Sequence, residues 1–454
     1  MYYCKGDTQK ASHYELFSLK NTMSVEDKFS VGSDSIDISG LDVLIKLCNY
    51  QPDPAEQDQF FTGVVLAEDM TSDKGVTLYT SGTTITQDRI ARLNAIHEMN
   101  PELKMHFKIK RSPEIIVKFK KEILEKLKNL LNHRTKYKIY SQLLGSVSDE
   151  IEAFFDELFN DESIVLTAYK MKFIVELSPH KNAPAFFEHA LSVPMFAFAI
   201  AQTPELEKRI TFAKDDLAGL VLAALFYNIG AVESIDSIMQ EDKKMHPRLY
   251  YDANRDSINL LAELKLGENT LTYMNKVIDY QNGDLTFVTD EENKGSWIAN
   301  IITVADLYVQ RESGLFGVRQ KISHIVDQLN VMAVSNKLNK NVVKALTVAL
   351  DLKDIFDFYQ EMDNLKYMCP WQLAAPYPMT GFKSPTLFIC KGNKNDCEHY
   401  EKSLKAITLI KPMGDIPKGK YARCLLTTPK LMKFYMKHYE EIKDDIKEIG
   451  KSKE

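Results

Sequence analysis

The chain has 454 residues, of which 44% are hydrophobic and 26% are charged, enough apolar material for two or three domains with a large core. Its net charge of −6 argues against general affinity for nucleic acid or for an anionic membrane surface. The N-terminus has no signal-peptide pattern, and the longest apolar run, around residues 217–227, is far shorter than the ~20 residues of a membrane span. We therefore expect a cytoplasmic protein with no transmembrane segment and no nucleic-acid partner.

The N-terminal quarter of the chain is predicted to hold a loose arm and a small β-rich module. Residues 1–34 are polar and aperiodic, which is typical of an unpacked arm. The module is expected at 35–112, with a hairpin whose turn lies at residues 72–75 between two apolar runs. An amphipathic helix should follow, with apolar side chains at Ile90, Leu93 and Ile96.

From about Pro113 to residue 365 the pattern is helical. Apolar residues recur at helical spacing from Ile115 to Leu130, and a second amphipathic helix is predicted from about Tyr137 to Leu158. These two helices either pack within their own domain or form a homodimer contact. Further helices are predicted at 183–202, with a kink at Pro194, and at 215–229, 257–266, 270–280, 296–309, 318–329 and 341–350.

The last part of the chain, 366–454, is predicted to be a small α+β module. Prolines interrupt any helix at its start, and a helix rich in lysine and glutamate is expected from about Pro429 to Ile449. Strands are predicted at 386–390, 406–410 and 422–426. The fold class is therefore mainly α, with a helical domain at 113–365 between the two small modules.

Four of the six cysteines lie in this last module, and one histidine lies close to them. Thiolates and imidazole are the ligands of structural zinc sites, which take four of them. The spacings are long and contain no Cys-x-x-Cys pair, so unpaired buried thiols are the simpler interpretation. A structural zinc ion is the only cofactor that the sequence suggests, and its candidate ligands are Cys369, Cys390, Cys397, His399 and Cys424.

Four short motifs of the helical domain stand in an order that resembles one enzyme family. They are Phe187-Glu188-His189, Phe226-Tyr227-Asn228-Ile229-Gly230, His246-Pro247 and Thr303-Val304-Ala305-Asp306-Leu307. Together they resemble landmarks of the HD-GYP cyclic-dinucleotide phosphodiesterases, metal-dependent members of the HD-domain phosphohydrolase superfamily. The resemblance covers about residues 55–355. It implies an HD-domain-type helical bundle, preceded by the small accessory module that often accompanies such domains.

The same resemblance implies that paired metal ligands have been lost. Tyr227 and Asn228 stand in place of the family's His-Asp pair, but asparagine is neutral and a phenol titrates only near pH ~10. A His-His-Glu run leads into Gly-Tyr-Pro in the family, whereas residues 277–284 of this chain, which include Tyr280 and Gln281, contain no histidine. A bridged two-metal centre needs ligands on both ions, so the site is predicted to be degenerate.

Three residues of the motif set are retained: His189, His246 and Asp306. Each has a simpler interpretation than metal binding. His189 lies among aromatic residues and is better explained as a hydrogen-bonded packing residue, and His246 is better explained as an exposed loop residue. Asp306 stands in an apolar run, where an unpaired carboxylate is costly to bury. A partner is therefore expected, and His189 is the candidate.

The resemblance implies a catalytically inactive HD-GYP-like regulatory or scaffold protein that acts through protein contacts in bacterial signalling. The alternative is an active metal-dependent cyclic di-GMP phosphodiesterase with unusual ligands, although no spare His-Asp pair lies between residues 181 and 310. Binding of cyclic di-GMP is expected to be weak or absent, because residues 310–319 lack the family's arginine spacing and the Gly-Tyr-Pro loop is missing. The expected partner is a protein, whose identity the sequence does not indicate.

Overall fold

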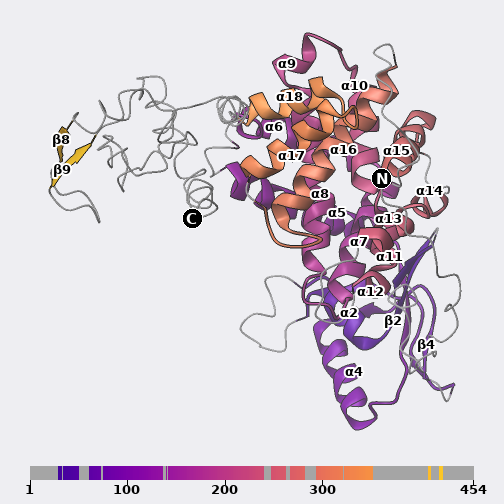
Figure 1. Ribbon diagram of the computed structural model, residues 1–454. Helices are drawn as coiled ribbons and strands as arrows, with labels where there is room; N and C mark the ends of the chain where they lie inside the picture. The colour runs from indigo at the N-terminus through magenta and orange to yellow at the C-terminus, as the bar shows by residue number, and fades with distance from the viewer. Residues whose placement is uncertain are drawn as a thin grey trace, which may run out of the picture. The chain divides into compact units, whose positions relative to one another are not determined.

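The computed structural model describes residues 29–32, 34–50, 61–72, 75–135, 140, 142–239, 247–261, 266–281, 293–320 and 322–350, together with the backbone of 407–410 and 419–422. The described part is mainly helical, with small antiparallel sheets near the N-terminus (Figure 1). The chain divides into two compact units, Met1–Val117 and Lys118–Glu454.

A three-stranded antiparallel sheet in the order β1-β2-β7 forms the base of the first unit. Its strands are β1 (Phe29–Val31), β2 (Ser35–Ser39) and β7 (His106–Lys110). In β2 the buried Ile36 and Ile38 flank the exposed Asp37, the alternation of a half-buried strand. Strand β1 lies inside the segment predicted as a loose arm, so that prediction is wrong at residues 29–31. The reason is Phe29, which is fully buried opposite Ile38.

The predicted hairpin of the first unit is confirmed. Strands β4 (Met70–Thr71) and β5 (Thr77–Tyr79) pair antiparallel, and Gly75 adopts the left-handed φ of 74° that the turn requires. The predicted helix is also confirmed as α4 (Gln87–Met99), in which Ile90 and Leu93 are fully buried. The other elements of this unit are α2 (Leu41–Cys48) and the paired strands β3 (Val64–Val65) and β6 (Thr84–Ile85).

The described helices of the second unit follow α5 (Pro113–Thr135), which spans the boundary between the units in the sequence. They are α6 (Ser148–Leu158), α7 (Glu162–Leu177), α8 (Pro184–Ala201), α9 (Pro204–Glu207), α10 (Lys214–Phe226), α11 (Ile229–Glu233), α12 (Ile235–Ile238), α13 (Pro247–Asn254), α14 (Ser257–Leu260), α15 (Glu268–Gln281), α16 (Lys294–Ser313), α17 (Ile322–Val334) and α18 (Lys340–Ala349). The core helices predicted from sequence are therefore present, with shifted ends.

Two helix predictions differ from the structure. The helix predicted to begin near Tyr137 begins at Ser148 instead, after a 3-10 turn at Gly145–Val147, because glycine is a poor helix former. Helix α7 was not predicted. It begins where the Asp161 side chain accepts a hydrogen bond from the backbone N–H of Ser163 at 2.8 Å.

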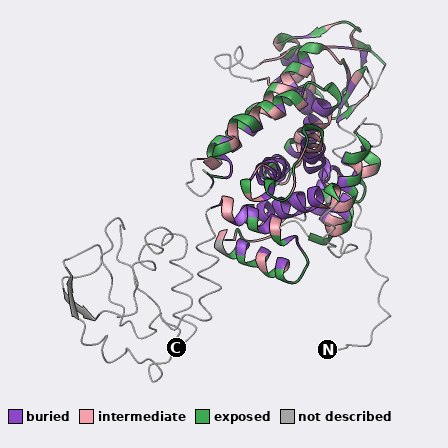
Figure 2. Cartoon of the chain, turned by 90° about the horizontal axis from the view of Figure 1, so that it is seen from above, coloured by how far each residue is buried: buried purple, intermediate pink, exposed green. Residues whose placement is uncertain are grey.

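Helix α8 is the centre of the second unit. It packs against α10 and α16, and α15 packs against both of these helices. Its sequence is apolar on all sides, the pattern of a helix surrounded by neighbours, and it continues through Pro194. Figure 2 shows the colour of buried residues concentrated on the inner helices.

Two stretches of this core, Pro184–Ala201 and Lys214–Glu233, are long and apolar enough to cross a membrane by length and composition alone. In each of them 83% of the tested window is buried inside the unit, as in the core helices of globular domains, which pass the same test. This finding is weak support for a membrane span. The predicted lack of a transmembrane segment and the cytoplasmic location stay predictions.

In the C-terminal module the structure describes two strands, β8 (Ile407–Ile410) and β9 (Gly419–Ala422), which pair antiparallel. Strand β8 matches a predicted strand. Strand β9 ends at Ala422, where a strand was predicted to begin. The strand predicted at 386–390, the final helix and the candidate zinc ligands lie outside the described residues.

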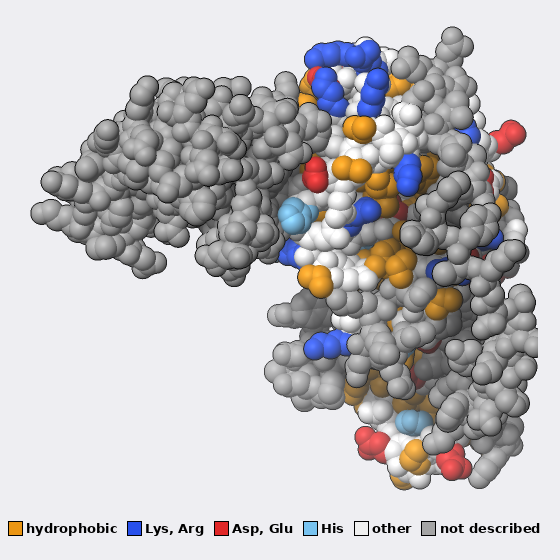
Figure 3. Space-filling model, viewed as in Figure 1, with side chains coloured by type: hydrophobic (Ala, Val, Ile, Leu, Met, Phe, Trp, Pro, Cys, Tyr) orange, Lys and Arg blue, Asp and Glu red, His pale blue; other side chains and the backbone are white. Residues whose placement is uncertain are grey.

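The drawn face of the second unit carries a group of Lys and Arg side chains at the end where α9 lies (Figure 3). The exposed residues there include Lys208, Arg209 and, on α18, Lys344. Glu205 lies between two of these cations, 3.3 Å from Lys208 and 2.6 Å from Lys344. Their hydrogen bonds lower the pKa of Glu205. The group is therefore partly neutralised by its own carboxylate.

Candidate functional site

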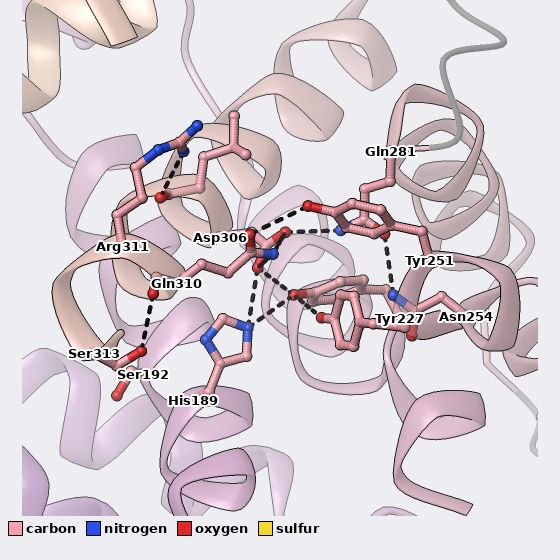
Figure 4. A network of polar contacts seen from close by, with 12 residues as sticks. His189, Ser192, Tyr227, Tyr251, Asn254, Gln281, Asp306, Gln310, Arg311 and Ser313 are labelled. Atoms are coloured by element: carbon pink, nitrogen blue, oxygen red, sulfur yellow. Dashed lines mark hydrogen bonds and ion pairs between the residues drawn. The ribbon is translucent and has the colours of Figure 1, made fainter. Parts of the chain in front are cut away.

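A buried cluster of polar side chains lies inside the second unit, surrounded by α8, α10, α13, α15 and α16 (Figure 4). Its central residue is Asp306 on α16, which is fully buried. His189 comes from the centre of α8, and Tyr227 is the residue that ends α10. Gln281 and Gln310 come from the last turns of α15 and α16. Helices α8 and α16 bury mainly apolar side chains, so Asp306 lies inside the hydrophobic core.

The Asp306 carboxylate accepts hydrogen bonds from Tyr227, Gln281 and Gln310, and His189 lies within ion-pair distance of it. Oδ1 lies 3.0 Å from Nε2 of His189 and 2.7 Å from the Tyr227 hydroxyl. Oδ2 accepts from Nε2 of Gln281 at 2.7 Å. The Gln310 amide nitrogen lies 2.8 Å from both oxygens, across one turn of the same helix. A carboxylate has about four lone-pair sites, so this one is saturated by the protein itself.

An outer layer of donors from α13 supports the groups around Asp306. The Tyr250 hydroxyl lies 3.2 Å from that of Tyr227, and the Tyr251 hydroxyl donates to the Gln310 side-chain oxygen at 3.3 Å. Asn254 likewise donates to the Gln281 side-chain oxygen at 3.1 Å. The central carboxylate only accepts hydrogen bonds, so it sets the direction of the others. The Tyr227 hydroxyl donates its hydrogen bond to Asp306, so the Tyr250 hydroxyl must donate to the oxygen of Tyr227.

Both central phenols stay protonated at neutral pH. Burial, followed by the nearby Asp306 charge, raises the pKa of Tyr227 well above its usual value. Burial also raises the pKa of Tyr250 well above its usual value, again with Asp306 as the next cause. A protonated phenol donates a hydrogen bond and is a poor metal ligand. Tyr227 therefore stabilises the negative charge of Asp306 by donating a hydrogen bond, although Tyr227 itself is uncharged.

The described residues of the cluster do not fit a two-metal centre. The side chains of His189 and Asp306 face each other, and both oxygens of the carboxylate already accept hydrogen bonds. In the stretch 277–284, where the resemblance implies histidines, Val277 and Ile278 are buried apolar side chains. Among the described residues, no group of three or more His, Cys, Asp or Glu side chains is placed to hold a metal ion.

Comparisons with protein-family models, with curated proteins and with solved structures find no match to this chain. The geometry of the cluster and the order of the sequence motifs are therefore the two sources from which a function is inferred.

The structure brings together four of the seven site positions expected from sequence, namely His189, Tyr227, Gln281 and Asp306. The expected pair between His189 and Asp306 is confirmed. Asn228 is buried beside Tyr227 in the chain but makes no hydrogen bond to the cluster in the described structure. The Tyr280 hydroxyl donates outside it, to the backbone oxygen of Lys337. His246 lies outside the described residues.

Sequence reasoning missed four members of the cluster. Gln310 had a local signal, because it stands four residues after Asp306 on one helix, where an amide and a carboxylate meet. The other three lie on α13, far from Asp306 in the sequence, and nothing local marks them. They are Tyr250, Tyr251 and Asn254.

A second buried contact lies farther along α16. Glu312 pairs with Arg134 of α5, with Nη1 and Oε2 at 3.0 Å, and also with Arg319. Arg134 donates to the Ser192 hydroxyl of α8 at 3.3 Å and lies over the Phe196 ring, 5.2 Å from its centroid. The side chains of Arg134 and Glu312 are 12% and 6% exposed, so this group joins three helices inside the unit. It has the character of a structural ion pair.

Gly230 on α11 is predicted to be intolerant of any side chain. A methyl group there would lie 2.2 Å from the backbone oxygen of Ala253 and 3.1 Å from the backbone nitrogen of Ser257. Gly230→Ala is expected to lower the free energy of unfolding in urea by about 1–3 kcal/mol, because rigid backbone must move. Gly267 is the matched control, since a methyl group there meets nothing within 4 Å. Equal losses at both positions would contradict the close packing of α11 on α13.

Proposed function

We propose that the second unit is a catalytically inactive HD-GYP-like domain, and that the protein is a regulatory or scaffold protein in bacterial signalling that acts through protein contacts. The observation that carries this proposal is the saturated Asp306 carboxylate. Its hydrogen bonds come from Tyr227, Gln281 and Gln310, and His189 pairs with it at 3.0 Å.

The energetics of the cluster support inactivity. To bind a metal ion, Asp306 and His189 would have to give up their contact with each other, and Tyr227 would lose its acceptor. A buried polar group left without a partner costs about 1–3 kcal/mol. The Tyr227 ring would also remain in the middle of the cluster with a neutral hydroxyl. His189, Tyr227 and Asp306 therefore serve packing and hydrogen bonding, and the proposed function is exerted by the surface of the protein.

Metal content and phosphodiesterase activity test the proposal directly. The full chain should be purified with Cys369, Cys390, Cys397 and Cys424 replaced by serine, so that those thiols hold no metal. We expect no stoichiometric iron, manganese or zinc, no hydrolysis of cyclic di-GMP above the rate in buffer, and no saturable micromolar binding of it by calorimetry. About two metal ions per chain together with hydrolysis would overturn the proposal, since a two-metal phosphodiesterase needs both.

A variant that restores the missing ligand types separates inactivity from a wrong family assignment. It carries Tyr227→His, Asn228→Asp, Val277→His and Ile278→His. If the unit has an HD-GYP-like arrangement, this variant should gain metal when the wild-type chain binds none. A variant that folds by circular dichroism yet gains no metal would count against the HD-GYP-like assignment. The wild-type chain, treated in the same way, is the control.

A further inference from the structure

The Asn228 side chain is fully buried, and in the part of the chain that the structure describes neither of its polar atoms has a hydrogen-bond partner. Exchanging the amide nitrogen and oxygen, which look alike in most structures, does not help, because both atoms are idle. The amide offers two hydrogens and two lone pairs. Asn228 is therefore an exception to the rule that buried polar groups in native proteins are bonded.

The local backbone explains why the Asn228 amide makes no hydrogen bond to the described residues. Asn228 stands at the N-cap of α11, where an asparagine side chain usually accepts a hydrogen bond from the N–H two or three residues later. Here the Gly230 N–H donates at 3.0 Å to the Ser257 hydroxyl, which in turn donates to the Tyr227 backbone oxygen at 2.8 Å. The serine takes over the capping role. The Asn228 amide is thus available for another partner.

Two members of the polar cluster also have idle polar atoms, namely Nδ1 of His189 and Oδ1 of Asn254. Nε2 of His189 faces the Asp306 carboxylate at 3.0 Å, so Nδ1 is the ring nitrogen that has no partner among the described residues. Buried polar atoms without a partner therefore occur on more than one residue of this core.

We propose that Asn228 binds an internal water molecule, in a hydration site built into the core beside the polar cluster. Water fits this chemistry because it donates and accepts at once, and a buried water usually makes about three hydrogen bonds to otherwise unpaired polar groups. The site does not depend on the proposed function. It would persist whether or not the domain acts on a nucleotide.

A crystal structure of the full chain tests the site directly. We expect ordered density about 2.7–3.2 Å from Nδ2 or Oδ1 of Asn228, the ordinary hydrogen-bond range. Waters bonded to other buried groups in the same crystal serve as the internal control for data quality. A dry amide in such a crystal would overturn the proposal, and so would an amide bonded to protein groups.

Matched alanine variants test it in solution. Asn300 is the control, a buried asparagine whose amide donates to the Ser296 backbone oxygen at 2.7 Å and accepts from the Asn339 N–H at 3.2 Å. Asn300→Ala loses both bonds and should lower the ratio of folded to unfolded protein by about tenfold or more. Asn228→Ala loses only water and should change that ratio far less. Equal losses in the two variants would show protein partners at Asn228 and overturn the proposal.

Discussion

Asp306→Ala is expected to lower the free energy of unfolding by about 3–5 kcal/mol, the usual cost of breaking a buried charge pair from one side. The substitution leaves the groups that donate to the buried carboxylate without their acceptor. Folded domains are stable by only about 5–15 kcal/mol, so the variant should be close to unfolding at room temperature. Urea denaturation followed by circular dichroism measures the loss.

The control for this prediction is Asp327→Ala, the same substitution at an exposed position of α17. A surface change of this kind should stay within about 0.5 kcal/mol of the wild-type chain. Tyr227→Phe, which removes one donor of the cluster and keeps the ring, should lie between the two, at about 1–2 kcal/mol. A loss at Asp306 no larger than that at Asp327 would mean that the cluster does not hold the helices together.

The free energy of unfolding of the second unit is expected to fall steeply between about pH 10 and 12, because of its buried tyrosines. Burial raises the pKa of Tyr140 to about 12, and raises those of Tyr227, Tyr250 and Tyr308 well above the usual value. Unfolded phenols lose their proton near pH ~10, whereas the native ones keep it. Above that pH the unfolded state binds fewer protons, so stability falls as pH rises.

Each such tyrosine contributes a slope of about 1.4 kcal/mol per pH unit once the unfolded phenol is ionised. This stabilisation is fully present below pH ~10 and is lost as the pH approaches the native pKa.

Measuring the free energy of unfolding in urea at several pH values gives the slope. Tyr227→Phe should reduce it by about 1.4 kcal/mol per pH unit. Phe155→Leu, a core change without a phenol, should lower the whole curve at an unchanged slope. A slope that Tyr227→Phe leaves unaltered would contradict the buried, protonated phenol.

Helix positions in the second unit were predictable because their signals are local. The apolar spacing of α5 and of the helix that carries Asp306 repeats every few residues, and the structure has both. The start of α6 and the presence of α7 were not predicted. A glycine and a single capping aspartate decided those ends, and such effects are small beside the periodicity over which a helix is recognised.

The pairing of His189 with Asp306 was predictable from the free-energy cost of burying an unpaired carboxylate, since a histidine was available as its partner. The complete set of partners was not. Gln281 and Tyr250 reach the cluster from helices that meet α16 only after folding, and their sequences resemble those of any amphipathic helix. Contacts between residues far apart in the chain leave no local pattern.

The sequence by itself determined that this protein has a mainly helical core, a small hairpin-containing module ahead of it, and Tyr227 and Asn228 where the resemblance implies a His-Asp pair. These features follow from residue type and spacing, which are properties of the chain. Only the tertiary structure decided what the remaining residues do. Packing of α8, α10, α15 and α16 places His189 beside the Asp306 carboxylate and directs the Tyr227 hydroxyl and two glutamine amides at it. Hydrogen bonds from neutral donors that the core holds in place therefore help to stabilise the buried charge.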